Sequence, residues 1–241
     1  MRKAASSMKH NPPFDYSLYL VTNRKLLKGK HLLKSIEESI AGGVTLVQLR
    51  EKELCTRDFF DLAVQVKAVT DRYHVPLIVN DRLDIALAAD AAGLHLGQDD
   101  LPVKVAREIL GTEKLLGVSV SNEEEALKAQ ADGADYLGVG AIFPTGTKLD
   151  ASPVTLETLR LIKARVVIPV VAIGGINQNN VRAVMNQRVD GIAVVSAILD
   201  KDDCRLAAKN LLDLVLSSKT GLRCSQNKPA PRTLISLPKQ N

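Results

Sequence analysis

The feature that most constrains this chain is a repeated alternation between short apolar runs and longer amphipathic stretches. The apolar runs are rich in β-branched residues and predict strands, whereas the amphipathic stretches carry apolar residues at helical spacing. The predicted strands are residues 17–21, 46–49, 77–79, 93–96, 115–119, 136–141, 170–173 and 191–195. The predicted helices are residues 31–41, 57–73, 103–110, 123–131, 156–164, 179–186 and 204–216. Eight such strands in about 200 residues predict an α/β fold, a single (β/α)8 TIM barrel, with an open doubly wound sheet as the alternative.

The two ends of the chain differ from this repeat in composition. Residues 1–14 carry three basic side chains and no acid, and residues 217–241 carry five basic side chains and no acid. The first segment also lacks the apolar stretch of a secretory signal, and the last is rich in Ser, Pro and Lys. The sequence therefore predicts a flexible leader at 1–14, a barrel domain at 15–216 and a disordered basic tail at 217–241.

Composition excludes several classes of protein. The formal charge is +5 for the whole chain, but the basic ends leave the predicted barrel mildly acidic, and only 3% of residues are aromatic. This argues against a nucleic-acid groove, which needs cations and stacking rings. No apolar run approaches the ~18 residues of a membrane span. The three cysteines are widely spaced, which argues against a disulfide framework or structural zinc and favours a reducing, cytoplasmic setting. Assembly into a homo-oligomer stays open.

In a TIM barrel the functional residues follow the carboxyl ends of the strands. After the second predicted strand, the two-residue period of an extended chain places Gln48, Arg50 and Lys52 on one face. Two cations on one face could bind an anion. For this segment alone, an exposed basic strand end is the simpler interpretation.

Acidic residues follow the third and fourth predicted strands. Asn80 and Asp81 end one strand, and Gly97-Gln98 leads from the next into Asp99 and Asp100. Carboxylates at adjacent strand ends can share one hard cation such as Mg²⁺, which takes few protein ligands and keeps water and phosphate oxygens. Each acid alone could equally cap a helix or close a turn, and the convergence of the two is the stronger signal.

Two further strand ends suggest phosphate binding. The segment Pro144-Thr145-Gly146-Thr147-Lys148 offers hydroxyls, a flexible glycine and an ammonium group, although it is not a P-loop. The loops after the seventh and eighth strands contain Gly174-Gly175 and Val195-Ser196, and this pair of loops is the usual phosphate site of the fold. His95 lies within a strand and is predicted to be a packed or hydrogen-bonded core residue.

The motifs at successive strand ends closely resemble thiamine phosphate synthase over roughly residues 16–216. The motifs that carry the resemblance are Gln48-Leu49-Arg50-Glu51-Lys52, Asn80-Asp81, Gly97-Gln98-Asp99-Asp100, Gly117-Val118-Ser119, Pro144-Thr145-Gly146-Thr147-Lys148, Ile173-Gly174-Gly175-Ile176 and Val195-Ser196. The resemblance implies one barrel that joins 4-amino-5-hydroxymethyl-2-methylpyrimidine diphosphate to a thiazole phosphate, with or without a carboxylate. The products would be thiamine phosphate and diphosphate.

The resemblance also implies a role for each matching residue. The pyrimidine diphosphate would be bound by Gln48, Leu49, Arg50, Glu51, Lys52, Asn80, Ser119 and Lys148. The thiazole phosphate would be bound by Thr145, Gly146, Thr147, Gly175, Val195 and Ser196. Asp81 and Asp100 would hold one Mg²⁺ ion. The catalytic residues would be Lys148, Arg50 and Lys52, which would stabilise the departing diphosphate in a dissociative substitution.

Two other functions stay open at the level of sequence. TenI-type paralogues are thiazole tautomerases that generally lack the metal-binding acids and carry a His two residues after the serine of the fifth strand. That position is Ser121 here, and Asp81, Asp100 and Lys148 are all present, which favours the synthase. The third possibility is a non-catalytic regulator that binds a phosphorylated ligand, for which the acid pair has no use.

Overall fold

The computed structural model describes residues 14–146 and 153–226, with side chains as far as residue 220. Eight parallel strands close into a barrel in which each strand pairs with the next along the chain and β8 pairs with β1. The strands are β1 (Leu18–Val21), β2 (Leu46–Leu49), β3 (Leu77–Asn80), β4 (Gly93–Leu96), β5 (Leu115–Val120), β6 (Tyr136–Val139), β7 (Val170–Ile173) and β8 (Gly191–Val194). The prediction of a TIM barrel is confirmed, and the open sheet is excluded.

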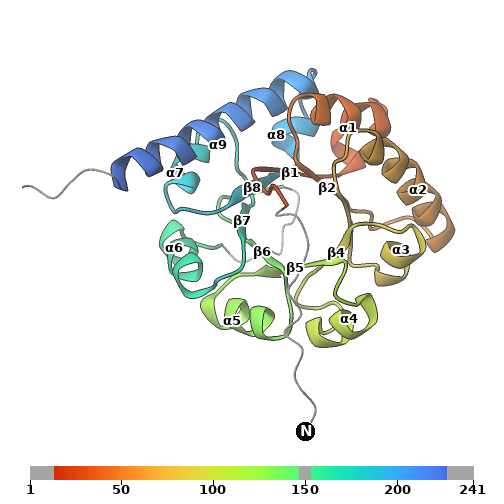
Figure 1. The fold of residues 1–241 in the computed structure, drawn as a ribbon. Coiled ribbons are helices and arrows are strands. Elements are labelled where there is room, and N and C mark those ends of the chain that lie inside the picture. The colour runs from red at the N-terminus through yellow and green to blue at the C-terminus, as the bar shows by residue number, and fades with distance from the viewer. Residues whose placement is uncertain (1–13, 147–152, 227–241) are drawn as a thin grey trace, which may run out of the picture.

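Helices surround this barrel, as the view along its axis shows (Figure 1). They are η1 (Arg24–Leu26), α1 (Leu32–Ala41), α2 (Thr56–Arg72), α3 (Leu83–Ala88), α4 (Val103–Leu110), α5 (Glu123–Ala131), α6 (Leu156–Arg165), α7 (Val181–Met185), α8 (Ser196–Leu199) and α9 (Cys204–Gln226). The last of them packs along α1, α7 and α8 and so covers the seam where β8 meets β1. Among the described residues, no helix combines the length and apolar character needed to span a membrane.

The alternation of side chains along each strand divides the interior into two layers. Residues such as Leu18, Leu20 and Leu49 point outward and form a large core with the helices. Their neighbours in sequence, such as Tyr19, point into the barrel and form a second, smaller cluster there. Because every other residue of a strand faces the same side, the register between neighbouring strands determines which side chains can reach the mouth of the barrel.

Besides the 3-10 turn η1, the structure adds two short α-helices that the sequence analysis does not predict. They are α3 (Leu83–Ala88), with six residues, and α8 (Ser196–Leu199), with four. Segments this short do not complete the i, i+3, i+4, i+7 pattern by which a helix is recognised, so their hydrophobic spacing carries little signal.

The predicted disordered tail is wrong over residues 217–226, because α9 (Cys204–Gln226) continues through them. The hydroxyls of Ser218 and Thr220 donate to carbonyls four residues earlier in the helix, at 2.8 and 3.0 Å, so residues typical of loops are satisfied within it. Lys219 Nζ also donates to Ser17 Oγ at 2.7 Å and ties the helix to the barrel. Phe14, assigned to the leader, packs against the inner cluster. The rest of the leader and of the tail lies outside the described residues.

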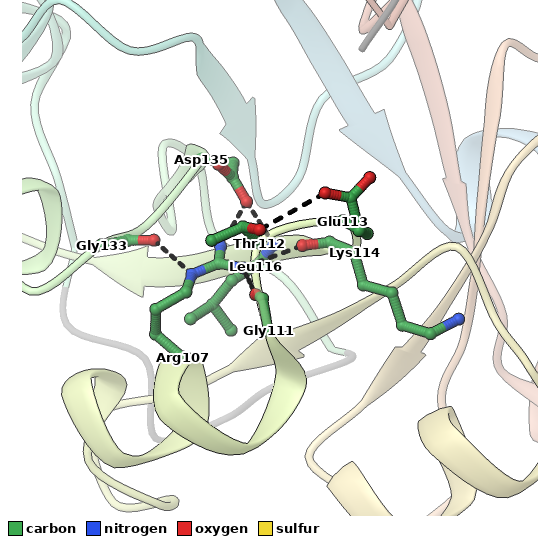
Figure 2. A network of polar contacts seen from close by, with 8 residues as sticks. All are labelled: Arg107, Gly111, Thr112, Glu113, Lys114, Leu116, Gly133 and Asp135. Atoms are coloured by element: carbon green, nitrogen blue, oxygen red, sulfur yellow. Dashed lines mark hydrogen bonds and ion pairs between the residues drawn. The ribbon is translucent and has the colours of Figure 1, made fainter. Parts of the chain in front are cut away.

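A network of hydrogen bonds around Arg107 connects loops at the end of the barrel opposite to the carboxyl ends of the strands (Figure 2). Arg107, on α4, donates to the carbonyls of Gly133, Gly111 and Lys114 at 3.0, 2.5 and 2.9 Å and pairs with Asp135. Asp135 in turn accepts the main-chain N–H of Leu116 at 2.9 Å. The guanidinium thereby joins α4 to the two loops that lead into β5 and β6.

We expect Arg107→Met to destabilise the fold by about 2–4 kcal/mol, because a partly buried guanidinium with four partners is lost while its acceptors stay. Both side chains of the Arg107–Asp135 pair are less than one-fifth exposed. Arg160→Met is the matched control, since Arg160 pairs with Glu157 on an exposed helix surface and should change stability by less than about 0.5 kcal/mol. Urea unfolding measures both. Equal unfolding midpoints for the two variants would show that the network contributes little.

Candidate active site

A cavity of about 280 Å³ opens at the carboxyl end of the barrel and is lined by residues from all eight strand ends. Its lining includes residues from within the barrel, such as Tyr19 and Tyr136, and residues from the loops that follow the strands, such as Asp100 and Thr145. A volume just below the usual range of ~300–1,000 Å³ suits a small ligand. This end of the strands is where a TIM barrel places its chemistry.

The predicted face after β2 is present in the structure. Gln48, Arg50 and Lys52 line the cavity, and Arg50 N donates to Thr22 Oγ1 at 3.0 Å, which fixes the strand end. Leu49 points outward into the core between strands and helices, and Glu51 pairs with Arg24 at 2.9 Å. Neither lines the cavity, so a ligand there could contact Leu49 and Glu51 only through their main chain.

The two predicted metal ligands come together beside Lys52. Asp81 follows β3 with a φ of +62°, a conformation that Asp tolerates better than most residues, and its N–H donates to the carbonyl of His95 at 2.8 Å. Its carboxylate forms an ion pair with Lys52 Nζ. Asp100 Oδ2 accepts the N–H of Gly97 at 2.7 Å. Both acids line the cavity together with Asn80.

Burial raises the pKa of the Asp100 carboxyl above its ordinary value, and the neighbouring Asp81 raises the pKa further. The N–H of Gly97 and the Lys52 ammonium act in the opposite direction. Two adjacent carboxylates form a donor set suited to a divalent cation, which offsets the cost of charging the buried Asp100. Within the described ranges no group of three or more His, Cys, Asp or Glu gathers.

The other side of the cavity is built by the loops after β6, β7 and β8. Gly175 has a φ of +62°, and a Cβ there would lie 2.6 Å from the carbonyl oxygen of Pro144, so the two loops touch where only glycine fits. The amides of Asn177 and Asn180 donate to the carbonyl of Gly175 at 3.2 and 3.0 Å and hold the turn.

The residues predicted to bind a thiazole phosphate divide into three groups. Four of them line the cavity, namely Thr145, Gly175, Val195 and Ser196. Gly146 follows Thr145 but is not part of the lining. Thr147 lies outside the described residues, as does Lys148, which is predicted to bind the pyrimidine diphosphate.

The structure also brings in residues to which the sequence analysis gives no role in the site. Tyr19, His95 and Tyr136 are buried and line the floor of the cavity. His95 is a hydrogen-bonded core residue, as predicted, with contacts to Tyr136 and Ser119. The signal that could have found all three is the two-residue period, because they share the inward face with Gln48 and Ser119.

Ser121 occupies the position at which the TenI-type paralogues carry a His. Its N–H and hydroxyl donate to Glu125 Oε2 at 2.7 and 3.0 Å, at the start of α5, and it does not line the cavity. Ser121 therefore forms hydrogen bonds at the start of α5 and does not contribute to the cavity.

Comparisons with known proteins agree on one family. The family model described as thiamine monophosphate synthase matches residues 18–198. Thiamine-phosphate synthase of Alkaliphilus oremlandii is 56% identical over 204 residues, which are 85% of this chain and 98% of that protein. The enzyme of the same name from Clostridium tetani is 56% identical over 202 residues, 84% of this chain and 97% of that one. The solved thiamine phosphate pyrophosphorylase of Pyrococcus furiosus matches with a TM-score of 0.79 and 42% identity, over 85% of this chain and 98% of that one.

Proposed function

Because the chain belongs to the thiamine monophosphate synthase family, we propose that the cavity at the mouth of its barrel binds both phosphorylated substrates of that reaction. The chain is an enzyme, a transferase that makes thiamine phosphate from small molecules. What is proposed here is the assignment of substrates, metal and catalytic groups to the two sides of the cavity.

The pyrimidine diphosphate binds on the side formed by β2 to β5. Gln48 and Asn80 contact the pyrimidine, while Arg50, Lys52, Ser119 and Lys148 bind the diphosphate. The side chains of Gln48, Arg50, Lys52 and Asn80 all reach the cavity, and this supports the assignment. Cations on one face of a strand end are well placed for an anion with several oxygens.

The thiazole phosphate binds on the opposite side, at the loops after β6, β7 and β8. Thr145, Gly175, Val195 and Ser196 support this assignment because they line the cavity there. Gly146 and Thr147, which follow Thr145 in the sequence, are assigned to the same phosphate. Loops after the seventh and eighth strands are the recurrent phosphate site of TIM barrels. One cavity with two anion-binding sides fits a reaction that joins two phosphorylated molecules.

Asp81 and Asp100 hold one Mg²⁺ ion. When bound, the ion neutralises charge on the diphosphate oxygens and supplies electrostatic stabilisation as that group departs. The chemistry of the donor set supports this, since two adjacent carboxylates at neighbouring strand ends suit a hard cation.

The reaction proceeds by dissociative substitution. The bond between the pyrimidine methylene carbon and the diphosphate oxygen breaks first, and its electron pair leaves with the diphosphate. Arg50, Lys52 and Lys148 stabilise the negative charge that develops there. The thiazole nitrogen then donates its lone pair to the methylene carbon, and the two sides of the cavity keep these atoms close together.

One observation carries this proposal. The acid pair Asp81 and Asp100 lies in the same cavity as the glycine turn at Gly175. A ligand-binding regulator would need the glycine turn but not the acids, and the tautomerases generally lack the acids. The free thiols of Cys55 and Cys204 support the further proposal that the enzyme works in the cytoplasm.

The direct test mixes purified protein with pyrimidine diphosphate and thiazole phosphate, with Mg²⁺ or with excess EDTA, and follows thiamine phosphate after oxidation to fluorescent thiochrome. We expect product with Mg²⁺ and at most a few per cent of that rate with EDTA. Circular dichroism under both conditions is the control for folding. A folded protein that makes no product would favour the tautomerase or a ligand-binding barrel, and equal rates would contradict the metal assignment.

A further inference from the structure

A chain of five hydrogen-bonded side chains crosses the floor of the cavity. Gln48 Nε2 donates to the hydroxyl of Tyr19 at 2.9 Å, and the hydroxyls of Tyr19 and Tyr136 are 2.9 Å apart. The Tyr136 hydroxyl lies 3.0 Å from His95 Nδ1, and His95 Nε2 lies 2.9 Å from Ser119 Oγ. The chain therefore connects Gln48 on β2 to Ser119 on β5 through the interior of the barrel.

The barrel makes room for this chain with glycines. A Cβ at Gly117 would lie 2.1 Å from Cζ of Tyr136 and 2.5 Å from His95 Nδ1, so no larger residue fits beside the two rings. Gly138 likewise faces the His95 ring, since a Cβ at that position would lie 3.1 Å from Cε1. The interior of a TIM barrel is usually filled by branched aliphatic side chains. This barrel instead keeps a polar layer directly below its mouth.

Counting donors and acceptors gives the chain a direction. The amide nitrogen of Gln48 can only donate, so Tyr19 accepts from Gln48 and directs its own proton to Tyr136. Tyr136 then directs its proton to His95 Nδ1, which must be the unprotonated ring nitrogen. The proton of the imidazole is on Nε2 and is donated to Ser119 Oγ. The hydroxyl proton of Ser119 is then available to a ligand, and Gln48 Oε1 remains as an acceptor.

Four of the five members of the chain are buried. Gln48, Tyr19, Tyr136 and His95 are each less than one-tenth exposed. Burial raises the pKa of both tyrosine hydroxyls well above the ordinary value, so both keep the protons that either order of the chain requires. The opposite order would need the Gln48 amide turned over, and Ser119 would then present a lone pair to the cavity. A ligand with an N–H group at Gln48 and anionic oxygens at Ser119 selects the first order.

We propose that Tyr19, Tyr136 and His95 are positioning residues, which order the hydrogen-bond chain so that Ser119 donates to a phosphate oxygen while Gln48 accepts from an N–H group of the same ligand. The inference rests on the proposed function, because an aminopyrimidine diphosphate carries both groups. It adds that recognition of the ring and of the diphosphate is coupled through the barrel floor.

The order of the chain is measured directly by nitrogen-15 NMR of the free protein labelled at histidine. The chain has four histidines, and the signals of His95 are those missing from His95→Gln. We expect a neutral ring with its proton on Nε2. A ring with its proton on Nδ1, or with protons on both nitrogens, would overturn the proposal. This measurement needs no substrate, so its outcome is independent of whether the protein makes thiamine phosphate.

Kinetics separate positioning from a merely structural role. In His95→Gln the amide nitrogen can still donate to Ser119, whereas in His95→Asn the shorter side chain can still accept from Tyr136 but does not reach Ser119. We expect kcat to fall by about tenfold to hundredfold in the Asn variant and to recover to within about fivefold of the original enzyme in the Gln variant. The KM for thiazole phosphate should stay within about twofold in both.

Tyr16→Phe is the matched control, because Tyr16 packs against the ring of Tyr136 at a centroid distance of 5.2 Å without belonging to the chain. Its kcat should stay within about twofold of the original. Equal losses of kcat in His95→Asn and His95→Gln, or an equal loss in Tyr16→Phe, would contradict the positioning role. If the unchanged enzyme makes no thiamine phosphate, the function proposed above fails, whereas the NMR result still decides the order of the chain.

Discussion

Asp100→Asn is expected to lower the rate of thiamine phosphate formation by about a hundredfold or more at a Mg²⁺ concentration that saturates the original enzyme. The substitution keeps the shape of the side chain and an oxygen that can accept the N–H of Gly97, so what is lost is the charge. Asp81→Asn should have an effect of similar size. Asn is the appropriate replacement at position 81 because it tolerates the positive φ of that residue.

The control for this pair is Asp90→Asn, which removes a carboxylate paired with Lys114 before β4 and so at the other end of the barrel. Asp90 also has a positive φ, 49°, so the control substitution is made in a left-handed backbone conformation like that of Asp81. The thiochrome assay across a Mg²⁺ titration measures the three variants. Activity of Asp100→Asn and Asp81→Asn within about threefold of the control would contradict their assignment as metal ligands.

Stability should move in the opposite direction from activity in the metal-free protein. The pKa of Asp100 is raised in the fold, first by burial and then by Asp81, so the folded state binds more protons than the unfolded state between the two pKa values. The free energy of unfolding therefore falls as pH rises through that interval, and the ionised carboxylate costs stability at neutral pH. Asp100→Asn should unfold at the same temperature as the original protein or above it at pH 7, which is the usual relation at a site built for function.

Lys148→Ala is expected to lower kcat by roughly a hundredfold to a thousandfold while the KM for pyrimidine diphosphate changes by less than about fivefold. The reason is that an ammonium group which stabilises a departing diphosphate is used most when the charge on that group is largest, in the transition state. Initial rates at varied pyrimidine diphosphate concentration separate the two constants.

Two variants make this result interpretable. Lys148→Arg keeps the charge and should recover part of kcat, although its planar group differs in geometry from an ammonium. Lys128→Ala is the control, because Lys128 forms an exposed ion pair with Asp132 on α5. An unchanged kcat in Lys148→Ala would exclude the leaving-group role, and a rise of KM alone would assign Lys148 to substrate binding.

Much of the candidate site can be predicted because its residues occupy repeated positions. A residue that follows a parallel strand of a closed barrel lies at one end of it, so position along the chain is enough to predict that Arg50, Asp81 and Asp100 gather. Their neighbours show the limit of that argument. Leu49 and Glu51 belong to the same motif but face the outer core and Arg24, and motif membership alone does not distinguish the inward side chains.

The polar floor of the cavity is harder to predict because its five hydrogen-bonded side chains come from five different strands. Tyr19, His95 and Tyr136 each lie in an apolar run, where the simplest interpretation is core packing. Their hydrogen bonds depend on the register between β1, β4, β5 and β6 and on the space left by Gly117. Neither the register nor that space can be predicted from the sequence of one segment alone.

The sequence by itself determined the eight strands, their alternation with helices and the strand ends at which the chemistry gathers, because hydrophobic periodicity is a local property that one segment can express. Closure of the sheet into a barrel, for which the sequence left an open sheet as the alternative, came from the tertiary structure. Only the tertiary structure decided that α9 continues to Gln226, that Lys52 pairs with Asp81, and that Gln48 is connected to Ser119 through three buried side chains. Those outcomes depend on contacts between residues far apart in the chain, whose free energy is gained only when the barrel closes and removes the polar groups from water.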